Sequence, residues 1–213
     1  MPTTFSGRRA ALAQQAGWQT SNELRDEEPV LVVDCGGSPP DADSAEPSAI
    51  VTDPSGLPVA ILCAEGSLAA LDPTGEAVGF HVLPPLEDAT LVELTGDRDS
   101  QAGRTAEDFF TTLGKHVAWV GDAPGLVLGR IVCQILNESA FALGEGVGSA
   151  EDIDAGMVLG MNHPRGPFQW GETIGWEHVL AVLDALADEY REERYRAAPA
   201  LRRAVATGTA PHV

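Results

Sequence analysis

The chain has 213 residues, of which 44% are hydrophobic, and this is enough to bury one core or two modest ones. It carries 32 acidic and 13 basic residues, for a net charge of −19, which disfavours nucleic acid and anionic membranes as partners. No run approaches the roughly 18 apolar residues of a membrane span, and the N-terminus has no apolar signal segment. Its three cysteines, Cys35, Cys63 and Cys133, fit neither a metal site nor a disulfide framework, so we expect a cytoplasmic protein.

The first half of the chain alternates helical and strand patterns. Residues 7–17 have helix-forming composition, and residues 38–56, rich in Pro, Ser and Asp, are predicted to form a loop or at most a short irregular element. Residues 105–114 are predicted to form a helix with Thr105 as its N-cap and Gly114 at its end. Short apolar runs predict strands at Val30–Val33, Pro58–Cys63, 79–85, 89–96 and Val117–Val120, the third and fourth on either side of a Pro-Pro turn. This alternation indicates an α/β sheet.

After Asp122 the pattern is helical throughout. Apolar residues recur at helical spacing over 124–144, and again from Thr173 to Tyr190. Between them, Ser149-Ala-Glu-Asp152 is a capping box that begins a short helix, and residues 162–167 form a rigid turn because they contain two prolines and a glycine. A last short helix lies in the C-terminal tail. We therefore predict two domains, residues 1–121 and 122–213.

Three motifs in this second half identify a family resemblance. They are D-A-P-G at 122–125, E-G-V-x-S-x-E-D-I-D at 145–154, and H-P-x-G-P-F at 163–168. In this order and spacing they resemble the 3-hydroxyacyl-CoA dehydrogenases, closely over residues 105–205 and less closely over residues 57–104. The resemblance implies an α/β fold followed by an all-α one: a reduced Rossmann-like sheet, then a helical bundle of the 6-phosphogluconate dehydrogenase C-terminal type. It also implies a homodimer formed through the helical domain.

The activity implied by the resemblance is NAD-dependent oxidation of a 3-hydroxyacyl-CoA in fatty-acid metabolism. That reaction needs a base for the hydroxyl proton, and a histidine held by a carboxylate is suited to the task. The family places this pair in a G-x-H-F-F-N-P-x-P-x-x-x-L-V-E segment, which here reads GFHVLPPLEDATLVE. His81 and Glu93 match the two catalytic positions, 93 − 81 = 12 residues apart.

Other family positions have changed. Pro84 replaces the asparagine after the histidine, and Gly129 replaces the asparagine that contacts the substrate after D-A-P-G. The serine of the family's A-S-N-T-S-S segment aligns with Gly66, which leaves the adjacent Ser67 as the candidate substrate-binding residue. Each missing donor would remove about a few kcal/mol of transition-state stabilisation.

The cofactor site departs further from the pattern. A dinucleotide site needs a strand, a G-x-G-x-x-G turn and a helix. Residues 7–18 resemble the family's first helix, but six residues precede Gly7, so we predict that the first strand is missing. Arg8 and Arg9 occupy positions that require small residues, and there is no room for the helical arm that contributes CoA contacts. We therefore predict no NAD cofactor.

Three interpretations follow. The chain is an enzyme that uses His81 and Glu93 with cofactor help from a partner chain, or a non-catalytic dimeric binding or assembly module in which the pair is structural. A third is that an open cleft binds an acyl-CoA without chemistry. The lost glycine turn favours the second. Outside this pair we predict structural or packing roles for His116, His163, His178, Trp170 and Trp176, and a solvated face for Arg191, Arg194, Arg196, Arg202 and Arg203.

Overall fold

A computed structural model describes residues 3–6, 31–35, 56–86 and 88–211. The chain forms two compact units, Met1–Gly129 and Arg130–Val213, so the division lies 129 − 121 = 8 residues after the boundary predicted from the sequence. The predicted helix 7–17, most of the predicted loop 38–56, and the two arginines at positions 8 and 9 lie outside the described residues.

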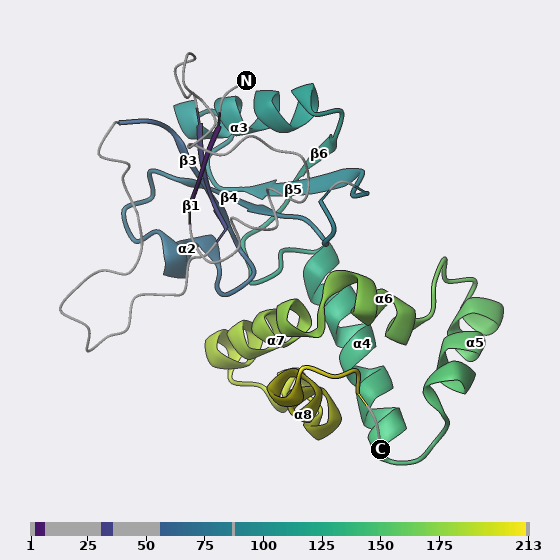
Figure 1. The fold of residues 1–213 in the computed structure, drawn as a ribbon. Helices are drawn as coiled ribbons and strands as arrows, with labels where there is room; N and C mark the ends of the chain where they lie inside the picture. Colours follow the sequence, from purple (N-terminus) through teal and green to yellow (C-terminus); the bar gives the residue numbers. More distant parts are fainter. Residues whose placement is uncertain (1–2, 7–30, 36–55, 87, 212–213) are drawn as a thin grey trace. The chain divides into compact units, whose positions relative to one another are not determined.

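Unit 1 is built on one six-stranded sheet (Figure 1). Its strands lie side by side in chain order, and every neighbouring pair is parallel except β4 and β5, which are antiparallel. The strands are β1 (Thr3–Ser6), β2 (Leu31–Asp34), β3 (Val59–Leu62), β4 (Val78–His81), β5 (Leu91–Thr95) and β6 (His116–Trp119). A mostly parallel sheet followed by a helical unit confirms the predicted fold class.

The prediction that the first strand is missing is wrong. Thr3–Ser6 forms β1, which pairs in parallel with β2, with Thr3 opposite Leu31 and Ser6 opposite Asp34. The sequence has no apolar run here, and apolar runs were the signal used to predict strands. Pairing in a sheet uses backbone N–H and C=O groups, so a short polar segment can form a strand when a neighbour presents an open edge.

Two helices complete unit 1, α2 (Leu68–Leu71) and α3 (Gln101–Thr112). Helix α3 packs on the sheet against β2 to β6 (Figure 1). It begins 105 − 100 = 5 residues earlier than predicted, because Ser100 and not Thr105 is its N-cap: the Ser100 hydroxyl accepts a hydrogen bond of 2.9 Å from Gly103 N. It ends at Thr112, two residues before the predicted end, with Leu113 as its C-cap and Gly114 following at a φ of +75°.

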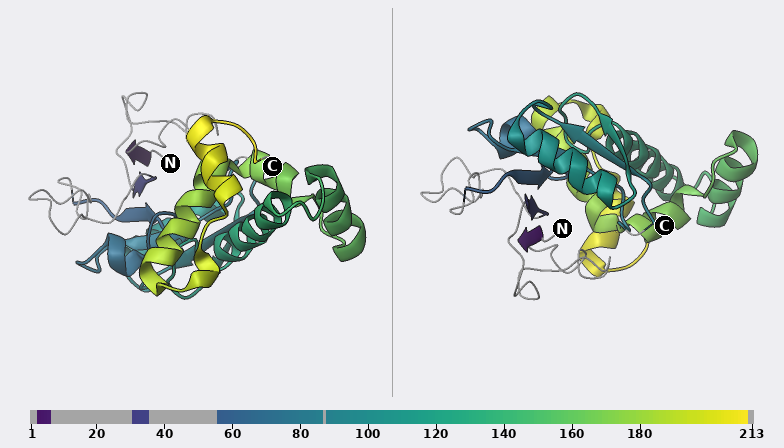
Figure 2. Two further views of the ribbon diagram at one scale, coloured as in Figure 1. Left: turned by 90° about the horizontal axis from the view of Figure 1, so that it is seen from below. Right: turned by 90° about the horizontal axis from the view of Figure 1, so that it is seen from above.

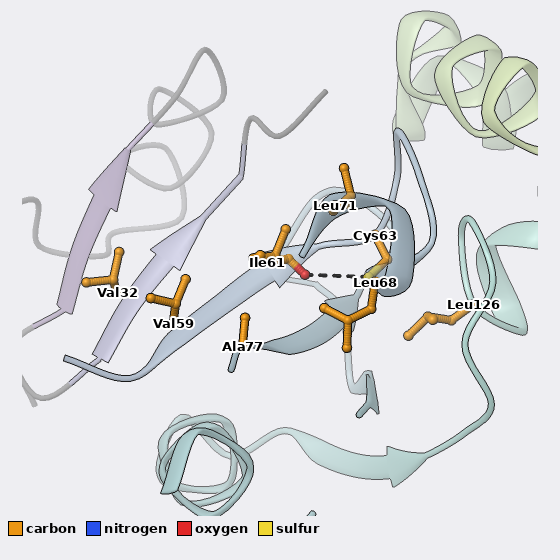
Figure 3. Close-up of a cluster of buried hydrophobic side chains, with 8 residues drawn as sticks. All are labelled: Val32, Val59, Ile61, Cys63, Leu68, Leu71, Ala77 and Leu126. Atoms are coloured by element: carbon orange, nitrogen blue, oxygen red, sulfur yellow. Dashed lines mark hydrogen bonds between the residues drawn. The ribbon is translucent and has the colours of Figure 1, made fainter. Parts of the chain in front are cut away.

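The sheet and α2 enclose a hydrophobic cluster (Figure 3). Leu68 and Leu71 from α2 pack against side chains of the central strands, and Leu126 reaches the same cluster from the segment before α4. The full cluster is Val32, Val59, Ile61, Cys63, Leu68, Leu71, Ala77 and Leu126. Burial of these side chains fixes α2, and with it the loop that follows β3, against the sheet.

Unit 2 is helical, and α4 (Leu128–Gly144) connects it to unit 1. The other elements are α5 (Ala150–Met161), α6 (Pro167–Ile174), α7 (Trp176–Tyr190), the short 3-10 helix η1 (Glu193–Tyr195) and α8 (Pro199–Thr207). Helices α7 and α8 pack together, whereas α5 packs mainly on α6 and stands away from both (Figure 2). Within the described part of the chain, no helix is long and apolar enough to cross a membrane.

The prediction of one helix beginning at Thr173 is wrong at its start. Thr173 belongs to α6, and the chain breaks at Gly175, whose φ of +93° ends α6 before α7 begins at Trp176. The predicted turn before α6 is present, and Pro167 occupies its first helical position, where a missing N–H costs nothing. Helical periodicity continued across the glycine, so the break was visible only in the backbone conformation.

Two of the family motifs contact each other in unit 2. Asp154, the last residue of the E-D-I-D stretch, accepts hydrogen bonds from Phe168 N at 2.7 Å and from Gln169 N at 3.2 Å, and so caps α6. A Cβ at Gly166 would lie 2.1 Å from Cγ of Asp154, so the glycine of H-P-x-G-P-F is needed for this approach. The predicted capping box is also present, with the Ser149 hydroxyl accepting a bond of 3.1 Å from Asp152 N.

Candidate functional site

His81 and Glu93 lie directly opposite each other in unit 1. His81 is the last residue of β4, and its cross-strand partner in the antiparallel β5 is Glu93. Antiparallel pairing brings the side chains of such partners to one face of the sheet, with Cβ atoms about 4.5–5.5 Å apart. Both side chains are buried, with 1% of His81 and 5% of Glu93 exposed. The sheet thus brings together the two residues that the sequence predicted as a catalytic pair.

The Glu93 carboxylate also holds the beginning of α4. Val127 N donates to Oε2 at 3.1 Å, and Leu128 N donates to Oε2 at 2.9 Å and to Oε1 at 3.2 Å. The first N–H groups of a helix have no partner within the helix, and they lie at the positive end of the helix dipole, which favours a carboxylate. Burial raises the pKa of Glu93 above its ordinary value, while the two donated hydrogen bonds lower it by a smaller amount.

Gly129, in the first turn of α4, lies against the His81 imidazole. A Cβ added at this position would be 2.3 Å from Cε1, 2.7 Å from Nε2 and 2.9 Å from Nδ1 of the ring. Atoms essentially never approach a Cβ so closely, so the ring occupies the space that any side chain at position 129 would need. This is the position at which the family pattern has a substrate-contacting asparagine.

The D-A-P-G turn is anchored at the carboxyl ends of the parallel strands. The Asp122 carboxylate accepts hydrogen bonds from Leu68 N at 2.7 Å and Ala69 N at 2.9 Å, which caps α2. Gly125 N donates to the Cys63 carbonyl, which lies directly after β3, at 2.5 Å. The motif therefore joins the loop after β3 to the segment that leads into α4. The sequence predicted the motif but not this role, because the contacts span more than fifty residues.

Ser67, the candidate substrate-binding residue, lies in that same loop. It is buried at the N-cap of α2, but its hydroxyl does not cap the helix, since Asp122 takes that role. The loop follows β3, and Cys63 N donates to the Phe80 carbonyl of β4 at 2.8 Å. Ser67 follows β3 and His81 is the last residue of the neighbouring parallel strand β4, so both belong to the same edge of the sheet.

Lys115, the only lysine of the chain, fastens the connection between the two strands of the pair. Its Nζ donates to the carbonyl oxygens of Leu86 at 2.8 Å and Ala89 at 2.6 Å. Both carbonyls lie between β4 and β5, after the cis Pro84–Pro85 peptide bond. Sequence reasoning missed this residue, although the position of a single lysine in so acidic a chain was a usable signal.

The remaining predicted residues have packing or surface positions. His178 and Trp176 are buried in α7, and Trp176 packs on Phe168 with ring centroids 6.0 Å apart. His116 is exposed at the start of β6. His163 contacts Trp170 edge to face, which gives it a packing role, and its Nδ1 has no hydrogen-bond partner among the described residues. The described residues contain no cluster of three or more His, Cys, Asp or Glu side chains suited to a metal ion.

Several arginines of unit 2 stack on aromatic rings. The Arg130 guanidinium lies 4.9 Å from the centroid of Tyr190 and 5.3 Å from that of Tyr195, and it donates to the Tyr195 hydroxyl. The Arg194 guanidinium lies 4.7 Å from the ring centroid of Tyr195, and its Nε pairs with the Glu192 carboxylate at 2.7 Å. The five arginines predicted to form a solvated face, Arg191, Arg194, Arg196, Arg202 and Arg203, are all exposed, and the stacking contacts hold Arg194 in place on that surface.

The order in which strands lie in a sheet decides where a dinucleotide can bind. Doubly wound sheets bind dinucleotides where the strand order reverses, beside the first strand. The described strands run from β1 to β6 in chain order without a reversal. Residues 7–30, which connect β1 to β2, number 30 − 6 = 24 and lie outside the described residues.

Comparison with known proteins identifies the family. Residues 125–212 match the family model "3-hydroxyacyl-CoA dehydrogenase, C-terminal domain". The chain is 44% identical over 101 residues to 3-hydroxyadipyl-CoA dehydrogenase of Escherichia coli (strain K12), which covers 47% of this chain and 21% of that protein. It is 35% identical over 133 residues to 3-hydroxybutyryl-CoA dehydrogenase of Bradyrhizobium diazoefficiens, and this match covers 62% of this chain and 45% of that protein.

A solved structure agrees with this match. The (S)-3-hydroxybutyryl-CoA dehydrogenase of Ralstonia eutropha superposes with a TM-score of 0.65 and 30% identity, over 84% of this chain and 66% of that one. The chain spans less than half the length of the two curated relatives named above. Sequence motifs, fold and both comparisons agree, and the chain belongs to the 3-hydroxyacyl-CoA dehydrogenase family.

Proposed function

We propose that this chain is a 3-hydroxyacyl-CoA dehydrogenase-like protein that does not hold NAD by itself and acts as a dimeric binding or assembly module. In this proposal His81 and Glu93 serve mainly to hold the start of α4. The observation that carries it is the strand order of unit 1, which runs without a reversal from β1 to β6 among the described strands.

A dinucleotide site in a doubly wound sheet requires a reversal of the strand order. The crevice for the pyrophosphate opens between strands that cross over in opposite directions from the first strand. Here β1 pairs in parallel with β2, and each later described strand is added beyond β2 in chain order. The sequence after β1, Gly7-Arg8-Arg9, also lacks the glycine spacing that lets a backbone approach a pyrophosphate. These residues do not fit the cofactor.

The environment of the pair supports a structural role. A general base must come within hydrogen-bond reach of the proton that it removes. The His81 ring instead lies against Gly129, and the Glu93 carboxylate accepts hydrogen bonds from two backbone amides of α4. Both groups thus make contacts that stabilise the fold whether or not a substrate is present.

The alternative is the dehydrogenase activity of the family, with the cofactor site completed by another chain. The direct cross-strand pairing of His81 with Glu93 favours it, because a carboxylate beside an imidazole can fix its tautomer and stabilise its protonated form. His81 would then take the proton of the 3-hydroxyl group, and Ser67 would contact the substrate. NAD would supply the hydride acceptor when bound.

We also propose that the chain forms a homodimer through its helical unit. Leu159 is 85% exposed and Met161 65% exposed, and both lie on α5, whose one buried side chain is Asp154. A groove of about 620 Å³ lies between α5 and α6, lined in part by Val158 and Phe168. Large apolar side chains gathered on one helix are typical of an interface, and a second copy can bury them by presenting the same surface.

Two measurements test the proposed function. Calorimetric titration with NADH is expected to show no binding tighter than about millimolar, and tighter binding would overturn the loss of the cofactor site. Reduction of acetoacetyl-CoA by NADH is expected to be absent. Measurable turnover that His81→Ala abolishes, while Glu138→Ala on the exposed face of α4 leaves it intact, would establish the alternative instead. Titration with acetoacetyl-CoA alone separates a binding module for acyl-CoA from one that recognises only protein.

A further inference from the structure

The His81 ring, at the end of β4, occupies the space in which a side chain at Gly129 of α4 would lie. All three of the ring atoms nearest to the Cβ position of residue 129 lie within 3.0 Å of it. Because Cε1 and both ring nitrogens are near this one point, the face of the imidazole and not its edge lies against the glycine. A methyl group at position 129 would require the ring, the helix, or both to move.

Both sides of this contact are held by other interactions. His81 ends β4, and its ring is almost completely buried, so it cannot swing into solvent without opening the site. Gly129 follows directly after Val127 and Leu128, whose amides are bonded to Glu93 on the neighbouring strand. The strands that carry His81 and Glu93 therefore fix the ring and the first turn of α4 at the same time. Neither the ring nor the helix can move freely to make room for an added side chain.

From this geometry we infer that Gly129 is a positioning residue for His81: the absence of a side chain sets the place and orientation of the imidazole against α4. The family pattern has an asparagine at this position, so this chain has exchanged a substrate-contacting amide for direct packing of the ring on the helix backbone. The inference goes beyond the proposed function, because it concerns the state of the ring whether or not the chain turns over a substrate.

The test is an NMR experiment on the imidazole itself. In a carbon–proton spectrum each of the five histidines gives its own Cε1–Hε1 peak, and the spectrum of His81→Ala identifies the one from His81. Gly129→Ala is expected to shift the His81 peak and to change the pH at which that peak titrates, with the other four peaks in place. The matched control is Gly156→Ala in α5, where an added Cβ meets nothing within 4 Å. It should leave all five peaks unchanged.

The result that overturns the inference is a His81 peak in Gly129→Ala that has the position and titration of the wild type. If Gly129→Ala does not fold, the double variant His81→Ala with Gly129→Ala decides. The double variant is expected to fold and to have a higher denaturation midpoint than Gly129→Ala, because removing the ring removes the clash. A double variant that also fails to fold would show that the added methyl group clashes with something other than the imidazole.

Discussion

Replacing Glu93 by alanine tests the link between the pair and α4 most directly. The substitution leaves the amides of Val127 and Leu128 without the acceptor that they now reach at 3.1 and 2.9 Å. A lost hydrogen bond costs about 1 kcal/mol, and more when the abandoned donor is fully buried. These two amides are only part-buried, so water can solvate them in the variant. We therefore expect Glu93→Ala to lower the free energy of unfolding by about 2 kcal/mol.

Urea denaturation at 25 °C, with hydrogen exchange of individual amides, measures this effect. The Val127 and Leu128 amides should lose protection in Glu93→Ala, and the loss should exceed that of amides in β5 itself. Glu138→Ala, on the exposed side of α4, is the matched control, and a surface substitution of this kind should change the stability by less than about 0.5 kcal/mol. Equal stability of Glu93→Ala and the control, with unchanged protection at the start of α4, would refute the reasoning.

Three further predictions concern the same chain. Burial raises the pKa of Glu93 above its ordinary 4.5, so folding favours the protonated form of this carboxyl. The stabilising contribution is therefore present below pH 4.5 and is lost as the pH rises through the folded-state pKa. The stability of the wild type relative to Glu93→Gln should therefore decrease over this range in urea titrations at several pH values, and a constant difference would contradict the assignment. Asp154→Ala removes the acceptor of Phe168 N and Gln169 N, and thermal or urea unfolding should show a loss of about 2–4 kcal/mol, whereas a loss below about 0.5 kcal/mol would exclude the capping role. Leu159→Asp should convert the proposed homodimer to a monomer in light scattering, and a wild type that is already monomeric at high concentration would remove that proposal.

The sequence alone determined the elements whose signals are local. Apolar runs located β2 and β3, and the capping box of Ser149 and Asp152 located the start of α5. The resemblance to a family also selected His81 and Glu93 from the sequence, and the register of β4 and β5 places them opposite each other. The predictions of β2, β3 and the start of α5 are confirmed because side-chain periodicity and capping act over a few positions along the chain.

The tertiary structure decided what depends on distant partners. Strand β1 has no apolar pattern and is defined by its pairing with β2, and the start of α3 depended on a serine that no periodicity marks. The capping of α4 by Glu93 joins residues 34 and 35 positions apart, and the approach of Gly129 to His81 spans 129 − 81 = 48 positions. A sequence read locally gives the residue types at such positions, but which backbone amide meets which carboxylate, and which ring fills the space above a glycine, is fixed only when the sheet and the helix pack together.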